Sequence, residues 1–246
     1  MARLLGLVLL AVGLLGAQAA RAADAALMEP IGYSENLRYF VFEEFGIQDG
    51  SGFAYSSIYM IDLSQDRWVV GTPIRVIAES EEEPLTSVRA HARADAEPLL
   101  TDLSIDVPAH ELASNGDGAP DNDGKSLVFG LPLPGSPDGL DGRHALGLET
   151  YTTASGSPCE DWFAEKAVGF VLSITDFGPQ REVHRDEVIP RSRGCPAQYR
   201  IHSVYAPFQA TDIASSVALI SVYVQGFEGL DRRFMAVALA KMQVGL

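Results

Sequence analysis

The sequence has few of the side chains from which catalytic and metal sites are commonly built. Its five histidines include no His-x-His, His-x-x-x-His or His-Glu-x-x-His spacing, so the common local zinc motifs are missing. No Gly-x-Ser-x-Gly sequence occurs, which removes the usual signature of a serine nucleophile. Zinc held by histidines that are distant in the chain stays an alternative, and so does a hydrolase built on carboxylates.

Basic residues are also scarce. The chain has 18 lysines and arginines against 33 aspartates and glutamates, a formal net charge of −15. Removing residues 1–22 discards two arginines and no acids, so 16 basic residues would face 33 acids, a charge of −17. A protein this acidic repels phosphate backbones and anionic lipids, and we therefore expect no nucleic-acid partner.

Long apolar runs are missing after the first residues of the chain. The run from Leu4 to Leu15 follows the basic Arg3 and precedes Ala20-Arg21-Ala22, a small-x-small cleavage pattern. Twelve apolar residues are too few to cross a bilayer. Residues 1–22 are therefore predicted to be a signal peptide, and we expect a periplasmic or secreted protein with no membrane insertion after cleavage.

Only two cysteines are present, Cys159 and Cys195. An exported chain meets an oxidising compartment, which favours a disulfide between them. A redox-active pair would usually need a Cys-x-x-Cys spacing, and the 36-residue separation does not fit it. The sequence predicts a single structural disulfide.

The clearest positive signal is a series of strands. Arg38–Phe42 and Ile58–Leu63 are aromatic and β-branched runs bounded by turn residues, and similar runs recur up to Phe234–Leu239. We expect residues 23–246 to form a single β-rich domain of about ten strands. The fold class is mostly β, either a β-sandwich-like arrangement or a partial β-propeller, with one helical insertion at about residues 80–105.

The insertion has helical periodicity. Apolar residues recur at spacings of three and four, which is one face of a helix: Leu85, Val88, Ala92, Ala96, Leu99 and Leu103. Pro98 is expected to kink or split this helix. Arg89 and Arg93 fall on the other side, so the pattern predicts that replacing Arg89 has little effect on stability.

Several strands begin in the same way. A polar turn, a basic residue and a strand follow one another at Asn36–Phe42, Asp123–Phe129, Asp141–Leu146 and Asp231–Val237. These openings resemble blade strands of the TolB-type β-propeller. The starts lie 87, 18 and 90 residues apart, however, whereas propeller blades repeat every 40–45 residues or so.

Three segments carry a second resemblance: the opening Gly32–Glu44, the turn Gln48–Gly52 and the close Tyr223–Phe234. With the signal peptide, they resemble a family of predicted secreted bacterial proteins of unknown function. The resemblance covers nearly the whole mature chain. It implies export, and it carries no functional residue.

One loop is a candidate metal site. Asn115, Asp117, Asp121 and Asp123 offer hard oxygen ligands of the kind that calcium prefers. The spacing of an EF-hand loop is absent, and Pro120 interrupts the pattern. A solvated acidic loop is the favoured interpretation, with calcium binding as the alternative.

Two hairpin tips form a candidate binding edge. The charged residues are Glu43, Glu44 and Asp49 at the first tip, and Glu228, Asp231, Arg232 and Arg233 at the second. If the first and last strand pairs share a sheet, these tips lie side by side, and neighbouring carboxylates shift each other's pKa. A basic run around Cys195, which includes Arg193, could also dock an acidic partner.

The absence of catalytic signatures favours an exported, non-enzymatic binding or accessory protein. Its partner would be an unknown periplasmic protein or small ligand. The alternatives are a periplasmic accessory protein that binds a divalent metal, calcium or zinc, and a carboxylate-based hydrolase.

Overall fold

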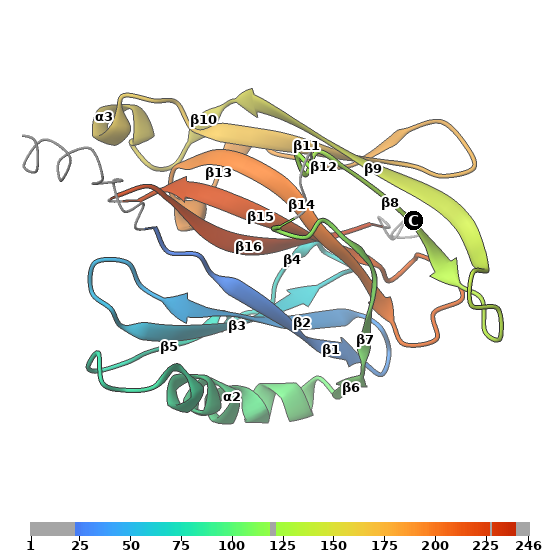
Figure 1. Ribbon diagram of the computed structural model, residues 1–246, viewed down its shortest axis with the longest axis horizontal. Helices are drawn as coiled ribbons and strands as arrows, with labels where there is room; N and C mark the ends of the chain where they lie inside the picture. Colours follow the sequence, from blue (N-terminus) through green and yellow to red (C-terminus); the bar gives the residue numbers. More distant parts are fainter. Residues whose placement is uncertain (1–22, 119–121, 227, 240–246) are drawn as a thin grey trace, which may run out of the picture.

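The computed structural model describes residues 23–118, 122–226 and 228–239. The predicted signal peptide and the last residues lie outside this range. The described chain is mostly β, as the sequence predicts. Figure 1 shows three sheets stacked face to face, with one long helix beneath them, so that the elements form four layers.

The sheet next to the helix, the helix-side sheet, is antiparallel. It has the order β4-β3-β2-β1-β6, and β5 also pairs with β3. Its strands are β1 (Leu27–Ser34), β2 (Tyr39–Ile47), β3 (Ala54–Asp62), β4 (Arg67–Trp68), β5 (Ile74–Ile77) and β6 (Ile105–Val107).

The other two layers are four-stranded antiparallel sheets. The middle sheet has the order β16-β15-β14-β7, and the far sheet has the order β12-β11-β9-β8. Their strands are β7 (Ala109–Ser114), β8 (Ser126–Pro132), β9 (Leu140–Thr152), β11 (Val168–Thr175), β12 (Arg181–Arg185), β14 (Pro196–Pro207), β15 (Val217–Gln225) and β16 (Leu230–Ala238). A small parallel pair, β10 (Ala154–Ser155) and β13 (Val188–Ile189), lies beside the short elements α3 (Cys159–Phe163) and η1 (Arg191–Arg193).

The middle sheet is covered on both faces, and its sequence explains this position. Along β15, alternate residues enter two different cores: Ala218, Ile220 and Val222 pack against the far sheet, and Val217 and Leu219 pack against the helix-side sheet. Side chains on a strand alternate between faces, so a strand buried on both faces needs an unbroken apolar run. Val217–Ile220 is such a run, and the buried Ser221 is the one polar residue between it and Val222.

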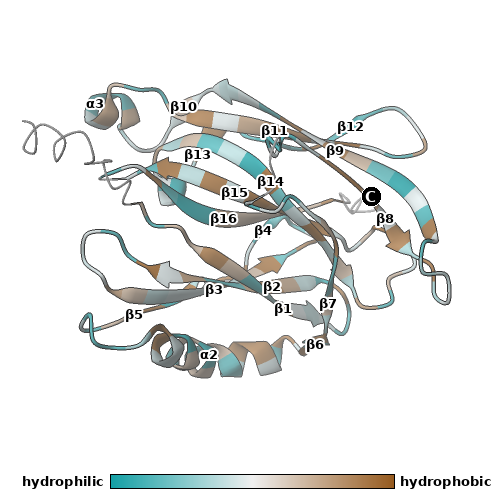
Figure 2. Ribbon diagram, viewed as in Figure 1, coloured by the Kyte–Doolittle hydropathy of each residue, from teal (hydrophilic) through white to brown (hydrophobic). Residues whose placement is uncertain are grey.

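Helix α2 (Leu85–Asp102) lies on the helix-side sheet as its apolar stripe predicts. Val88, Ala92 and Ala96 are fully buried, and Leu99 and Leu103 pack beside Val41, Ile58 and Met60 of the sheet. Figure 2 shows both hydrophobic and hydrophilic stretches along this helix. Pro98 lies inside one continuous helix, so the expected split does not occur.

Strand β1 was missed by the sequence analysis because Pro30 and Gly32 interrupt its pattern. The structure accommodates both at a bulge, where the register to β2 shifts between Pro30 and Gly32. Gly32 has φ = 152°, and a Cβ atom there would lie 2.7 Å from the Val107 carbonyl oxygen. Glycine is required here because β6 approaches the backbone closely. The short helix α3 was also not predicted.

The first and last strand pairs do not share a sheet, which corrects the expected edge. β2 and β3 belong to the helix-side sheet, and β15 and β16 belong to the middle sheet that stacks on it. β7 pairs with β14 and β1 pairs with β6, whereas propeller blades are built from consecutive strands. The arrangement is the β-sandwich-like alternative.

Two covalent or backbone connections join distant parts of the chain. The predicted disulfide between Cys159 and Cys195 is present, and both cysteines are buried with Ala167 and Ile189. At the other end, Ala25 forms an isolated parallel bridge with Arg232 of β16. The first described residues are thus tied to the last strand.

Candidate functional site

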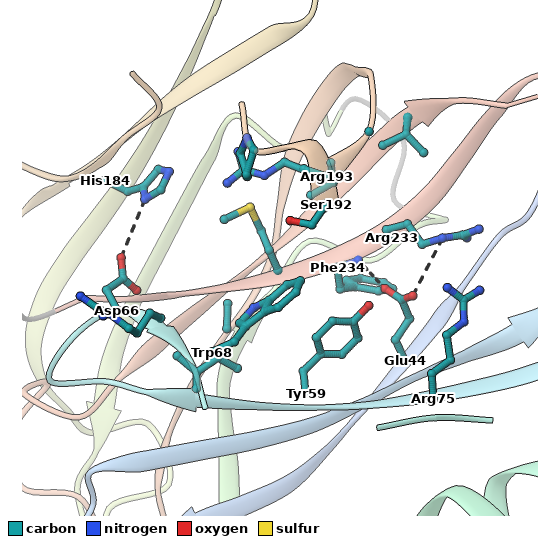
Figure 3. A pocket seen from close by; sticks show the side chains of 18 residues that line it. Glu44, Tyr59, Asp66, Trp68, Arg75, His184, Ser192, Arg193, Arg233 and Phe234 are labelled. Atoms are coloured by element: carbon teal, nitrogen blue, oxygen red, sulfur yellow. Dashed lines mark hydrogen bonds and ion pairs between the residues drawn. The ribbon is translucent and has the colours of Figure 1, made fainter. Parts of the chain in front are cut away.

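A cleft of about 460 Å³ opens between the helix-side sheet and the middle sheet. One wall comes from β3, β4 and β5, and the opposite wall comes from β15 and β16. The segment Pro190–Gly194, which contains η1, closes the top in Figure 3. The cleft lies where the short strands β4 and β5 leave the edge of one sheet incomplete.

The floor of the cleft is aromatic. Tyr59 of β3 and Trp68 of β4 meet edge to face, with ring centroids 5.3 Å apart. Phe42 stacks behind Tyr59 at 5.0 Å and fixes its ring from the core side. Trp68 keeps 40% of its surface exposed although it lies against this cluster. A half-exposed indole beside a half-buried phenol is a surface on which an apolar molecule can pack.

Charged groups lie at both ends of this floor (Figure 3). At one end, Asp66 lies 3.9 Å from His184, whose other ring nitrogen contacts Asp186 at 3.0 Å. Burial alone would lower the pKa of His184, but the hydrogen bonds with the two aspartates outweigh it and raise this pKa. The other end carries Glu44, Arg75 and Arg233.

The charge of the cleft contrasts with that of the chain. Four arginines line it, Arg67, Arg75, Arg193 and Arg233, against the two carboxylates of Glu44 and Asp66. Arg193 is paired with Asp186 at 2.7 Å, and Arg233 with Asp24 at 2.8 Å. Arg67 and Arg75 are exposed and form no ion pair within the described part of the chain.

Glu44 is a buried carboxylate at the cleft wall. Its Oε2 accepts a 2.7 Å hydrogen bond from the Phe234 backbone N–H, and its Oε1 lies 4.0 Å from Arg233 Nε. Burial raises the pKa of Glu44 to about 7, because Arg233 and the Phe234 N–H offset only part of the lost hydration. The nearby Asp24 carboxylate adds to the rise, and Arg75 opposes it.

The raised pKa of Glu44 predicts how the stability of the fold depends on pH. A carboxyl whose folded pKa lies above its unfolded value of 4.5 stabilises the fold fully below pH 4.5, and this contribution is lost as the pH rises to about 7. Between pH 4.5 and 8, Glu44→Gln should therefore gain stability relative to the wild type, by roughly 3 kcal/mol at the upper end. Urea unfolding at a series of pH values measures this difference. Parallel stability curves for the two proteins would contradict the assignment.

Glu43 points the opposite way from Glu44, since adjacent residues of a strand face opposite sides. Its side chain has no exposed surface and lies under helix α2. Arg89 binds both of its oxygens, at 2.8 and 3.0 Å, and Ser56 donates another hydrogen bond at 2.8 Å. Burial alone would raise the pKa of Glu43, but these partners together with Arg93 lower it below its usual range.

The remaining residues of the expected binding edge do not line the cleft. Arg232 is buried, donates to the Ala26 carbonyl oxygen at 2.8 Å and pairs with Asp117 at 2.5 Å. Asp231 accepts a hydrogen bond from the Asp24 backbone N–H at 2.9 Å. Asp49 and Glu228 form no ion pair among the described residues, and the structure does not bring them to the cleft.

The candidate metal loop is held by protein contacts. Asn115 donates to the carbonyl oxygens of Ser126 and Ile201, and Asp123 accepts a hydrogen bond from the Lys125 N–H at 2.8 Å. Asp117 is paired with Arg232, and Asp121 lies outside the described residues. Within residues 23–118, 122–226 and 228–239, no group of three or more metal-ligating side chains is placed to hold an ion. Calcium binding stays a prediction.

Glu44 and Arg233 were expected at one binding edge, and Arg193 in a separate basic run. Nothing in the sequence pattern pointed to Tyr59, Trp68 or Arg75 as parts of the same site. The signal in the sequence is weak. Ile58–Leu63 and Trp68–Val70 read as consecutive strands, so Tyr59 and Trp68 could have been placed on paired strands. His184 and Arg193 come from a segment more than a hundred residues later, and only the fold brings them to the same cleft.

A family model described as "Predicted secreted protein (DUF2259)" matches residues 41–240, which include all 18 residues that line the cleft. The chain belongs to this family. The secreted nature of the family agrees with the predicted signal peptide. No curated protein and no solved structure matches the chain. No helix in the described residues is long and apolar enough to cross a membrane.

Proposed function

We propose that this member of the secreted family is a binding protein and that the cleft between the helix-side and middle sheets holds its ligand. The observation that carries the proposal is the joint presence, in one concave site, of an exposed indole, a half-buried phenol and two arginines that form no ion pair with the described residues. Apolar walls with a few polar groups at defined positions are the usual composition of small-molecule sites. The volume of about 460 Å³ lies within the range of such sites, roughly 300–1,000 Å³.

The carboxylates of the cleft support binding over hydrolysis. Glu44 is fixed by the Phe234 N–H, and Asp66 contacts both His184 and the Ala238 N–H. Glu43, which the sequence suggested as a hydrolytic residue, lies on the far side of the sheet under Arg89. These three carboxylates therefore have a structural role: their hydrogen bonds and ion pairs hold neighbouring strands and arginines in position.

A fluorescence experiment tests the proposal. The chain has two tryptophans, and Trp162 on α3 is not among the residues that line the cleft. In a Trp162→Phe variant, the tryptophan emission comes from Trp68 alone. We expect some members of a panel of neutral, anionic and cationic small molecules to shift this emission saturably and to raise the melting temperature.

The control is Trp68→Ala, which removes the floor of the cleft. Trp68 is partly exposed, so this variant should fold, and it should lose the thermal stabilisation that Trp162→Phe keeps. Equal stabilisation of the two variants by the same compounds would place the binding elsewhere. The proposal fails if no compound shifts the Trp68 emission saturably.

A further inference from the structure

The cleft exposes one edge of strand β16, and the backbone groups on that edge follow a regular pattern. N–H groups two residues apart on a strand point the same way. The N–H groups of Arg232, Phe234 and Ala238 all point away from β15 and donate to acceptors outside the sheet. The acceptors are the Asp24 carbonyl oxygen at 2.7 Å, Glu44 Oε2 at 2.7 Å and Asp66 Oδ1 at 3.3 Å.

Ala236 lies between these positions and lines the cleft. Its N–H must point the same way as those of Phe234 and Ala238. No acceptor for it lies among residues 23–118, 122–226 and 228–239. Side-chain carboxylates thus accept hydrogen bonds from the N–H groups of Phe234 and Ala238. The Ala236 N–H, which lies between them in the cleft, is available to an acceptor from a ligand. A backbone donor that faces a cleft is a common anchor for an acidic group.

The side chains of the cleft that holds this donor favour an anion. Arg67 and Arg75 line the same cleft and form no ion pair in the described part of the chain. Glu44 and Asp66 already accept hydrogen bonds from the protein, and Asp66 also faces His184. A guanidinium binds a carboxylate through two parallel hydrogen bonds, which selects this group over a neutral amide.

From these contacts we infer that the ligand is a small organic acid with a planar apolar body. The body packs on Tyr59 and Trp68, the carboxylate accepts the Ala236 N–H, and Arg67 and Arg75 supply the opposite charge. The inference rests on the proposed function, since it names the chemical class that the same cleft would bind.

Titration calorimetry with two probes tests this class. The first probe, 2-naphthoate, carries the carboxylate, and the second, 2-naphthamide, has the same rings without the charge. At pH 7.5 we expect the mature protein to bind 2-naphthoate at least tenfold more tightly. The double variant Arg67→Gln/Arg75→Gln should reduce this preference below threefold and leave the affinity for the amide unchanged. Arg185→Gln, which changes an exposed residue on the edge strand β12 of the far sheet, is the matched control and should keep the preference.

A backbone variant tests the N–H donor separately. Ala236→Pro removes only this N–H, at an edge position where proline is tolerated. We expect it to lose the preference for 2-naphthoate, and the double arginine variant decides the matter if the proline variant does not fold.

The possible outcomes separate the two proposals. Equal affinity for the two naphthyl compounds, or a preference that survives the double variant, overturns the organic-acid inference while the cleft remains a binding site. If other compounds saturate the Trp68 signal and neither naphthyl compound binds, the inference again fails alone. Failure of every compound at Trp68 overturns the proposed function as well.

Discussion

Replacing Arg89 by alanine is expected to lower the free energy of unfolding by about 3 kcal/mol. The Glu43 side chain, which has no exposed surface, would lose two of its hydrogen bonds and one of its two arginine partners. Breaking a buried ion pair costs far more than breaking an exposed one, because the remaining charge stays away from water. Arg93, whose Nε lies 3.2 Å from Glu43 Oε2, would compensate for part of the loss. Urea unfolding at pH 7 measures the change.

Arg185→Ala is the matched control. Arg185 also pairs with a glutamate, Glu182, but both side chains are more than 40% exposed, so the expected loss is much smaller than for Arg89→Ala. Adding Glu43→Gln to Arg89→Ala should recover stability, because no buried charge then remains. Since the pKa of Glu43 is lowered in the fold, the stability that its pairing provides is lost as the pH falls through that pKa. Similar losses for Arg89→Ala and Arg185→Ala would show that Arg89 does not stabilise Glu43.

Val88→Asp is expected to be the most damaging single substitution on helix α2. Val88 is fully buried, and it packs against Ala54 and Ala78 with Leu85 beside it. An aspartate there would be a buried charge in an apolar contact, and we expect a loss of about 5 kcal/mol, comparable to the whole stability of many domains. The unfolding transition should move to much lower urea or disappear.

The same change two residues along the helix provides the control. Ala90 is exposed on α2, so Ala90→Asp should cost only the difference in helix propensity, about 0.5 kcal/mol. Val88→Ala keeps the site apolar and should lie between the two. Comparable losses for the two aspartate variants would mean that the apolar stripe does not face the sheet.

Val88 and Arg89 show what the sequence could and could not predict. The apolar stripe of α2, which includes Val88, follows from helical periodicity and depends only on the helix itself. The burial of this stripe was therefore predicted correctly. The structure argues against the expectation that replacing Arg89 has little effect, because Arg89 binds the buried Glu43, which lies 46 positions away on a different element. A charge pattern along a helix does not reveal which carboxylates the underlying sheet presents.

A misplaced strand boundary caused this error and another. The aromatic and β-branched run ends at Phe42, which places Glu43 and Glu44 in a predicted hairpin tip, whereas β2 continues to Ile47. Two consecutive acids inside a strand must face opposite sides, and both sides of this sheet are covered. The two glutamates are therefore buried in different interfaces, one under α2 and one at the cleft.

The cleft could not be predicted from the sequence, for a different reason. Its walls come from segments around Tyr59, Trp68, His184 and Arg233, whose mutual positions depend on how the sheets stack. Strand periodicity predicts which residues share a face of one sheet. It does not predict which sheets face each other, so Glu44 and Arg233 were expected along one edge and are found across two layers.

The tie between the first described residues and β16 has a consequence for the order of folding. Asp24 accepts the Arg232 N–H and donates its own N–H to Asp231, a contact that spans 207 positions of the chain. These bonds cannot form until nearly the whole chain is available, and loop closure over such a distance is slow compared with local hairpin formation. The first residues of the exported chain therefore cannot form their native contacts before the last strand is present. The native contacts of Asp24 are completed only after synthesis has reached β16.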